Sequence, residues 1–137
     1  MGFVYVGGKT NQKTNGYVKI GETNKKYLSS RVGEIRAKEG NFVVFKYLEI
    51  PDSTLSITRA IEGHARMMLE RDGYQQVQND HFELAVTPET KDVLYRNFAD
   101  RAIFYMEQYC AWTGIPYEVK FGNPQARKNV RRREKNS

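Results

Sequence analysis

Cysteine is almost absent from the chain, which has a single one, Cys110, among 137 residues. A lone thiol excludes an intrachain disulfide framework and a zinc site made of several cysteines. Because Cys110 lies among apolar residues in a helical pattern, we expect it to be a buried structural thiol.

Long apolar runs are absent as well. No stretch approaches the roughly 18 to 20 uninterrupted apolar residues of a membrane span. The N-terminal segment MGFVYVGGK lacks the basic and apolar regions of a signal peptide. We therefore expect no membrane partner and a cytoplasmic location, which is the host cell cytoplasm if a phage encodes the chain.

Basic side chains are concentrated near the two ends of the sequence. Residues 120–137 contain seven Lys and Arg and one Glu, so the net charge of this segment alone equals the +6 of the whole chain. Residues 1–40 contain eight basic and three acidic side chains, and residues 41–119 contain seven and twelve. Two basic zones attract a polyanion through phosphate contacts and counterion release, so nucleic acid is the first partner to consider. A solvated tail with ordinary surface lysines is the alternative.

Strands are predicted where β-branched and aromatic residues alternate or cluster between turn residues. The first two are joined by a loop rich in Gly, Asn and Lys, which indicates an antiparallel hairpin. Pro51 stops the third, because proline cannot continue the ladder of hydrogen bonds. The predicted strands cover residues 3–7, 17–22, 41–50 and 80–86, with a further short one at 117–121.

Three helices are predicted from apolar residues at helical spacing. The first lies within 23–40, where Leu28, Val32 and Ile35 form the stripe. The second is capped by Asp52 or Ser53 and runs toward a glycine at position 73.

The third helix is the longest and is expected at 87–113, with Thr87 as N-cap and Pro88 at its first position. Its predicted apolar face comprises Leu94, Phe98, Ala102, Tyr105, Tyr109 and Trp112.

These elements predict an α/β (α+β) fold with a small, mixed but largely antiparallel sheet flanked by helices. At 39% hydrophobic content, 137 residues suffice for one compact domain. We expect a core over residues 1–86, a helical extension packed on it over 87–119, and a basic, flexible tail over 120–137.

Four short motifs occur in a fixed order along the predicted elements. The first strand carries Tyr5 in FVY, and the second carries Lys19 in KIG. The helix that follows presents Arg31, and the next helix presents Glu62. In this order and spacing the chain resembles the GIY-YIG nuclease superfamily, particularly its small phage-type DNA-binding branch, over about residues 2–84.

The resemblance implies a metal-dependent DNA endonuclease that hydrolyses phosphodiester bonds with Mg²⁺, or Mn²⁺ in its place. Such an enzyme needs a group that activates water, positive charge for the phosphate and a metal ligand. By resemblance these roles fall to Tyr5 or Tyr17, to Arg31 and to Glu62. The resemblance also implies a supporting polar residue in the segment that closes the domain, and this role falls to Asn79 or Asp80 in NDHFEL.

Lys19 stands where the family's second motif has a tyrosine. Lysine is a poor base at neutral pH unless burial or a cationic neighbour lowers its pKa from about 10.4. Tyr17 and Lys19 are two apart on a strand and so share a face, which Tyr5 joins if the register allows. We interpret Lys19 as a group that contacts the phosphate or orients water. The alternative is a catalytically inactive DNA-binding module of the same fold.

Basic residues near the predicted site and in the tail are expected to contact DNA phosphates, which positions the duplex without reading its bases. They comprise Lys9, Lys13, Lys25, Lys26 and Arg36, and in the tail Arg127, Lys128, Arg131, Arg132 and Arg133. His64 and His81 match no zinc spacing. We interpret His64 as a helix-surface residue and place His81 near the site only through its neighbour Asp80.

A third class is an assembly protein that uses the aromatic helix at 87–113 as an interface. A homodimer is also left open, because single-domain nucleases often need a second copy to cut both strands.

Overall fold

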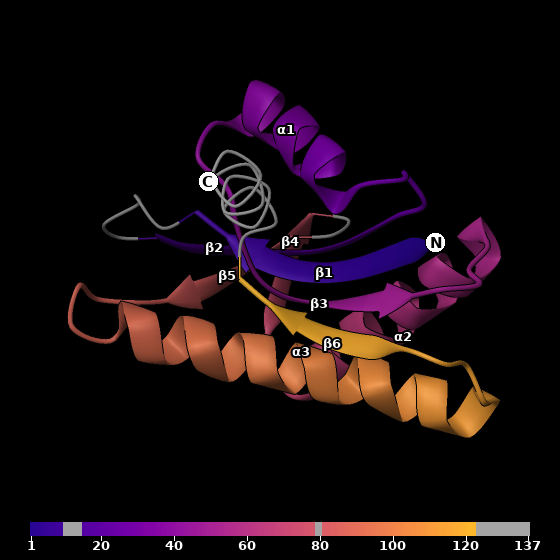
Figure 1. The fold of residues 1–137 in the computed structure, drawn as a ribbon. Helices are drawn as coiled ribbons and strands as arrows, with labels where there is room; N and C mark the ends of the chain where they lie inside the picture. The colour runs from indigo at the N-terminus through magenta and orange to yellow at the C-terminus, as the bar shows by residue number, and fades with distance from the viewer. Residues whose placement is uncertain (10–14, 79–80, 123–137) are drawn as a thin grey trace, which may run out of the picture.

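One sheet with helices on both faces forms the body of the molecule (Figure 1). The computed structural model describes residues 1–9, 15–78 and 81–122. The elements in these ranges are β1 (Gly2–Gly8), β2 (Asn15–Thr23), α1 (Leu28–Glu39), β3 (Val43–Ile50), α2 (Leu55–Arg71), β4 (Gln75–Gln78), β5 (His81–Ala85), α3 (Lys91–Thr113) and β6 (Glu118–Phe121). The fold is α+β, with the long C-terminal helix that the sequence predicts.

The strand order is β4-β5-β2-β1-β3-β6, and every neighbouring pair within the described ranges is antiparallel. This confirms the largely antiparallel sheet that the sequence predicts, and no parallel pair occurs among the described strands. Tyr5 lies opposite Gly21, and Lys19 lies between Gly7 and His81. Since side chains alternate along strands, Tyr5, Lys19 and His81 share one face.

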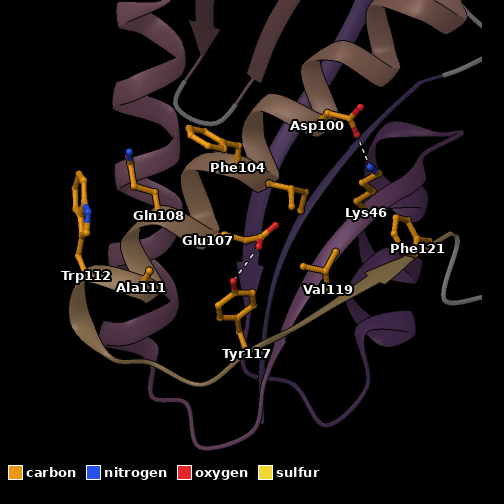
Figure 2. Close-up of a pocket in the computed structure, with 11 residues that line it drawn as sticks. Lys46, Asp100, Phe104, Glu107, Gln108, Ala111, Trp112, Tyr117, Val119 and Phe121 are labelled. Carbon is orange, nitrogen blue, oxygen red and sulfur yellow. Dashed lines mark hydrogen bonds and ion pairs between the residues drawn. The ribbon is translucent and has the colours of Figure 1, made fainter.

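The surface between α3 and β6 is hollowed and has exposed aromatic side chains at its rim (Figure 2). Two polar contacts cross it. Lys46 forms an ion pair with Asp100, and the Tyr117 hydroxyl donates a hydrogen bond of 2.8 Å to Glu107. The acidic side chains of this hollow are thus already engaged within the protein.

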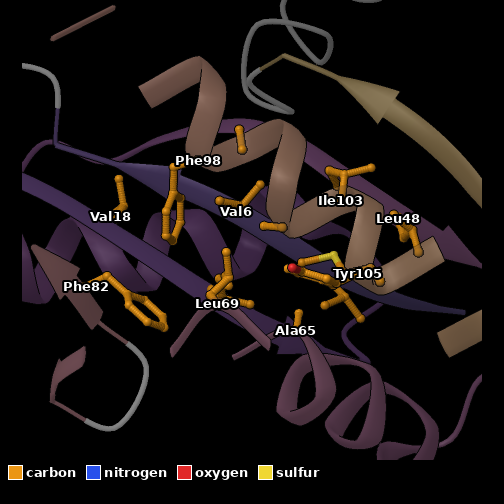
Figure 3. Packing of buried hydrophobic residues seen from close by; sticks show 14 of the residues in the cluster. Val6, Val18, Leu48, Ala65, Leu69, Phe82, Phe98, Ile103 and Tyr105 are labelled. Atoms are coloured by element: carbon orange, nitrogen blue, oxygen red, sulfur yellow. The ribbon is translucent and has the colours of Figure 1, made fainter. Parts of the chain in front are cut away.

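The larger apolar core lies between the sheet and helices α2 and α3 (Figure 3). Val6 and Val18 of the sheet meet Leu69 of α2 and Phe98 of α3, and all four are fully buried. Burial of each such side chain contributes about 1.5 to 3 kcal/mol. The two helices are therefore fixed on this face of the sheet.

The smaller core lies on the opposite face, under α1 (Figure 1). The predicted stripe of Leu28, Val32 and Ile35 is buried there against Tyr5 and Phe42, which confirms it. Because α1 and α2 cover opposite faces, the polar residues of α1 and those of α2 lie on different sides of the sheet.

The start of α2 differs from the sequence prediction. The Thr54 hydroxyl accepts a hydrogen bond of 3.4 Å from the Ile57 amide and so acts as the N-cap. Neither Asp52 nor Ser53 is therefore the capping residue, and the helix begins at Leu55.

The start of α3 also differs. Thr87 and Thr90 exchange hydrogen bonds of 2.9 and 3.2 Å between amides and hydroxyls, which closes a separate turn. The helix consequently begins at Lys91 rather than at Pro88.

The predicted apolar face of α3 is confirmed at Phe98, Ala102 and Tyr105, which are buried. Ala99, Met106 and Cys110 extend this buried face, whereas Trp112, the last predicted member, is 68% exposed. Desolvation, with a smaller effect of Glu107, raises the pKa of the Cys110 thiol to about 11, as suits the buried structural thiol predicted from the sequence. Across the described ranges, no helix combines the length and apolar content that a membrane crossing needs.

Candidate functional site

Four polar side chains converge on the sheet face that α1 covers. Glu39, the last residue of α1, accepts a hydrogen bond of 2.7 Å from the Tyr17 hydroxyl. Its other carboxylate oxygen lies 3.8 Å from Lys19 Nζ and 3.7 Å from His81 Nε2. Lys19 is only 5% exposed. Glu39 therefore supplies the negative charge that a buried ammonium group needs.

Tyr5 reaches this face because β2 has a glycine beside it. A Cβ atom on Gly21 would clash with the hydroxyl and ring of Tyr5, so the phenol lies across β2 at this point. The phenol contacts Arg31 of α1. Desolvation opposes the charge of the Arg31 guanidinium, but the interactions with Tyr5 and Glu34 outweigh it and raise the pKa of Arg31.

Tyr17, Lys19 and the phenol of Tyr5 thus form a row along β2. Alternate residues of a strand are about 6.5 to 7 Å apart. The predicted shared face of Tyr17 and Lys19 is confirmed, and the register brings Tyr5 to the same face. Above the row, α1 presents Arg31 at one end and Glu39 at the other.

Glu62 lies on α2, which packs against the opposite face of the sheet through Ile61 and Ala65. Its side chain is 13% exposed, and its carboxylate lies 3.5 Å from Arg66 Nε. The structure therefore brings Tyr5, Tyr17, Lys19 and Arg31 to one face, and it places Glu62 on a helix that covers the other.

The edge of β2 offers a route between the two faces. β5 pairs with β2 up to Lys19 and His81, so in the described ranges residues 20–23 have a neighbouring strand on one side only. The Thr58 hydroxyl of α2 donates a hydrogen bond of 3.0 Å to Glu22, so α2 runs beside this open half. A ligand that touched both Arg31 and Glu62 would have to pass around this edge. Asn79 and Asp80 lie outside the described residues.

The resemblance to the GIY-YIG nucleases assigns the binding of a divalent metal to Glu62. Magnesium commonly binds proteins through one or two carboxylates, while water and substrate phosphates complete its shell. Glu62 fits this requirement in donor type, but its ion pair with Arg66 must break before a metal ion can bind. Within residues 1–9, 15–78 and 81–122, no group of three or more His, Cys, Asp or Glu side chains could hold a metal ion.

Three of the predicted DNA-binding lysines have contacts in the described part of the chain. Lys9 Nζ lies 4.5 Å from the ring centroid of Tyr17, and Lys26 Nζ lies 5.6 Å from that of Tyr27. Lys25 forms an ion pair with Glu34.

Arg36 has a structural contact. Its Nε donates a hydrogen bond of 2.9 Å to the carbonyl oxygen of Phe42, which fastens the connection from α1 to β3. The other predicted phosphate contacts lie outside the described residues, namely Lys13, Arg127, Lys128, Arg131, Arg132 and Arg133.

Sequence reasoning missed Glu39 and Glu34. A signal existed for Glu39, because an acidic residue in the last turn of a helix opposes the macrodipole, which favours cations there. Glu39 stands in that turn just before the C-cap Gly40. For Glu34, the i, i+3 spacing from Arg31 was a signal in the sequence, whereas its second partner, Lys25, lies in the loop before the helix and could not be read from helical spacing.

Searches with this chain against protein-family models, curated proteins and solved structures found no match.

Proposed function

We propose that the chain is a metal-dependent DNA endonuclease of the GIY-YIG type, which hydrolyses phosphodiester bonds. One observation carries the proposal. The buried phenol of Tyr5 crosses β2 at Gly21 and supports Arg31, in a row with Lys19 and Tyr17 on the same face. Arginine, lysine and phenol groups are the types that a phosphate and an attacking water require.

In this proposal Arg31 binds the scissile phosphate. Its guanidinium group is partly exposed and is supported from the protein side by Tyr5, so less freedom is lost when phosphate binds. Lys19 adds positive charge beside the reacting group, and Glu39 holds it in place.

Tyr17 is the tyrosine that activates water, because it is half-buried whereas Tyr5 is fully buried. The Tyr17 hydroxyl already donates to Glu39 at 2.7 Å. It can therefore pass its own proton to Glu39 as it accepts one from the attacking water. Sequence reasoning left the choice between Tyr5 and Tyr17 open.

Glu62 would hold Mg²⁺, or Mn²⁺ in its place. When bound, the metal supplies Lewis-acid stabilisation of the charge that develops on the phosphate. Asn79 or Asp80 keeps the supporting polar role that the resemblance implies.

A DNA-binding module without cleavage is the second candidate. The separation of Glu62 from the row by the sheet favours it, as does the burial of Lys19 against Glu39. Such a module would use Arg31 and the surrounding lysines for the same phosphate contacts and would lack the metal-dependent step.

The test is incubation of supercoiled and linear DNA with the full chain and Mg²⁺, with EDTA as one control. Glu62→Gln is compared with Glu70→Gln, which removes the same charge from an exposed position of the same helix. Cleavage that EDTA and Glu62→Gln abolish, and that Glu70→Gln retains, supports the nuclease. Salt-sensitive binding with no product in Mg²⁺ or Mn²⁺ supports the module. A protein that neither binds nor cuts DNA contradicts both.

A further inference from the structure

One carboxylate, that of Glu34, bridges two cations that the proposed function assigns to DNA. Glu34 Oε2 accepts a hydrogen bond of 3.1 Å from Arg31 Nη1. Glu34 Oε1 accepts a hydrogen bond from Lys25 Nζ. Arg31 lies one turn earlier on α1, whereas Lys25 lies in the loop that follows β2. The carboxylate therefore ties together two separate segments at the open end of β2.

Both cations stand on anchored parts of the chain. The Lys25 amide donates a hydrogen bond of 3.1 Å to the hydroxyl of Thr23, which is buried. Arg31 is supported from the protein side by Tyr5. The two positive groups consequently meet at one place that opens to solvent, since both side chains and that of Glu34 are partly exposed.

The charge state of Glu34 follows from these neighbours. Hydrogen bonds from Lys25 and then from Arg31 hold the pKa of its carboxyl below the ordinary value. Glu34 is therefore ionised at neutral pH and neutralises one of the two positive charges. A phosphodiester also carries one negative charge on two oxygens, so it matches the carboxylate that now fills this place.

Helix stability accounts for only part of the arrangement. In an i, i+3 or i, i+4 pair, the order with the acidic residue nearer the helix N-terminus is the more favourable one. Here Arg31 precedes Glu34, and α1 has no acidic residue in its first turn. The contact from Lys25 is not a helix pair at all.

We propose that Glu34 is an internal stand-in for a phosphate of the DNA backbone. In the free protein its carboxylate occupies the anion site of Lys25 and Arg31, and a bound phosphate displaces it. Exposed ion pairs contribute little to stability, so displacement is possible without unfolding. The identity of the ligand as DNA rests on the proposed function, whereas the phosphate chemistry rests on the contacts themselves.

The first experiment uses inorganic phosphate as the probe. It is titrated into the wild-type chain and into Glu34→Gln and Glu70→Gln, while the amide resonances of Lys25 and Arg31 are followed by NMR. We expect Glu34→Gln to bind phosphate about three to ten times more tightly than the other two. Equal responses in Glu34→Gln and Glu70→Gln would overturn the proposal, because both variants lose one negative charge.

The second experiment measures affinity for a short DNA duplex at about 0.05 and 0.15 M ionic strength. Glu34→Gln should bind about three to ten times more tightly than Glu70→Gln at the lower salt. The gain should disappear when Arg31→Gln and Lys25→Gln are introduced together, since the displaced carboxylate then has no cations to compete for. A gain that persists in that background is a general charge effect and contradicts the proposal.

The two experiments separate this inference from the proposed function. If phosphate binds more tightly to Glu34→Gln but no variant binds DNA, the anion site stands and the DNA function is wrong. If DNA binds while Glu34→Gln matches Glu70→Gln in both titrations, the stand-in role is wrong and the DNA function stands.

Discussion

The hydroxyl of Tyr17, on β2, donates a hydrogen bond of 2.7 Å to the carboxylate of Glu39, at the end of α1. This contact joins the sheet to the C-terminal turn of the helix that covers it. It also links the only half-buried phenol of the row to a group that can accept its proton. Its removal should therefore affect both stability and cleavage.

Tyr17→Phe should lower the free energy of unfolding by about 1 kcal/mol, which is below the usual range for hydrogen bonds to charged groups because Glu39 is 28% exposed. Urea unfolding measures this loss. In the nuclease, the same change should lower the cleavage rate about 100-fold or more, with little effect on DNA affinity. Tyr27→Phe, at an exposed tyrosine, is the control and should change neither quantity. A fully active Tyr17→Phe protein contradicts the role given to Tyr17.

Lys19→Met should remove the ammonium group that lies 3.8 Å from the carboxylate of Glu39. Breaking a fully buried ion pair costs about 3 to 5 kcal/mol, but partial exposure of Glu39 screens this pair. We expect a loss of about 1 to 2 kcal/mol in urea unfolding. The double variant Lys19→Met/Glu39→Gln should lose less than the sum of the single changes, because the two groups interact.

Cleavage by Lys19→Met distinguishes a catalytic role of Lys19 from a structural one. If Lys19 stabilises the transition state, its loss should lower the rate about 100- to 1000-fold while DNA affinity changes little. Lys38→Met, which removes a charge from an exposed position of α1, is the matched control. Rates of the two variants that agree within error would show that Lys19 is structural.

Gly21→Ala should disturb the site, whereas Gly63→Ala should not. The added Cβ at Gly21 would clash with Tyr5 and push its phenol away from Arg31, at a cost of about 1 to 3 kcal/mol. At Gly63, an added Cβ would meet no heavy atom of the described structure within 4 Å other than its chain neighbours and the backbone of its own helix. Because alanine favours helix over glycine, Gly63→Ala should stabilise the chain by about 1 kcal/mol. Thermal and urea unfolding of both variants check the opposite signs, and a tolerated Gly21→Ala would contradict the packing of Tyr5.

Asp72, which follows the last turn of α2, should make stability depend on acid pH. Its carboxylate accepts hydrogen bonds from the Tyr105 hydroxyl and from Arg101 Nε of α3. The bond from Tyr105, and then that from Arg101, hold the pKa of Asp72 below its ordinary value of 3.8. Because the folded pKa is depressed, the stabilisation is fully present above pH 3.8 and disappears as the pH falls through the folded value.

The measurement is the melting temperature of Asp72→Asn and wild type at neutral pH and in strong acid. Asp72→Asn should melt at a lower temperature at neutral pH, and the difference should shrink below pH 3.8. Asp52→Asn, at an exposed turn position, is the control and should follow wild type throughout. A difference that is independent of pH would mean that Asp72 acts through packing rather than charge.

Local patterns predicted much of the fold. The spacing of Leu28, Val32 and Ile35 correctly gave the buried face of α1, and the alternation of Tyr17 and Lys19 gave their shared face. Both depend only on neighbours in the sequence and on the periods of helix and strand. β4 was missed, because QQVQ has almost no apolar residues to mark it.

The arrangement of the site depended on contacts between distant segments and was harder to predict. Glu39 meets Lys19 because α1 lies over β2, and it meets His81 because β5 pairs with β2, and periodicity cannot encode either contact. Similarly, the position of Glu62 beside the stripe of α2 was visible in the sequence. The choice of sheet face for α2 was not, since it depends on the connection around β3.

The last strand of the sheet, β6, is made from residues near the C-terminal end and pairs with β3, one step from the centre. Termination of translation before Glu118 would leave the outer backbone groups of β3 exposed between residues 46 and 49. An uncovered edge of this kind can template pairing with another chain. Premature stop codons in this region should therefore yield aggregating products even though α3 is intact, which makes β6 a solubility determinant of the whole protein.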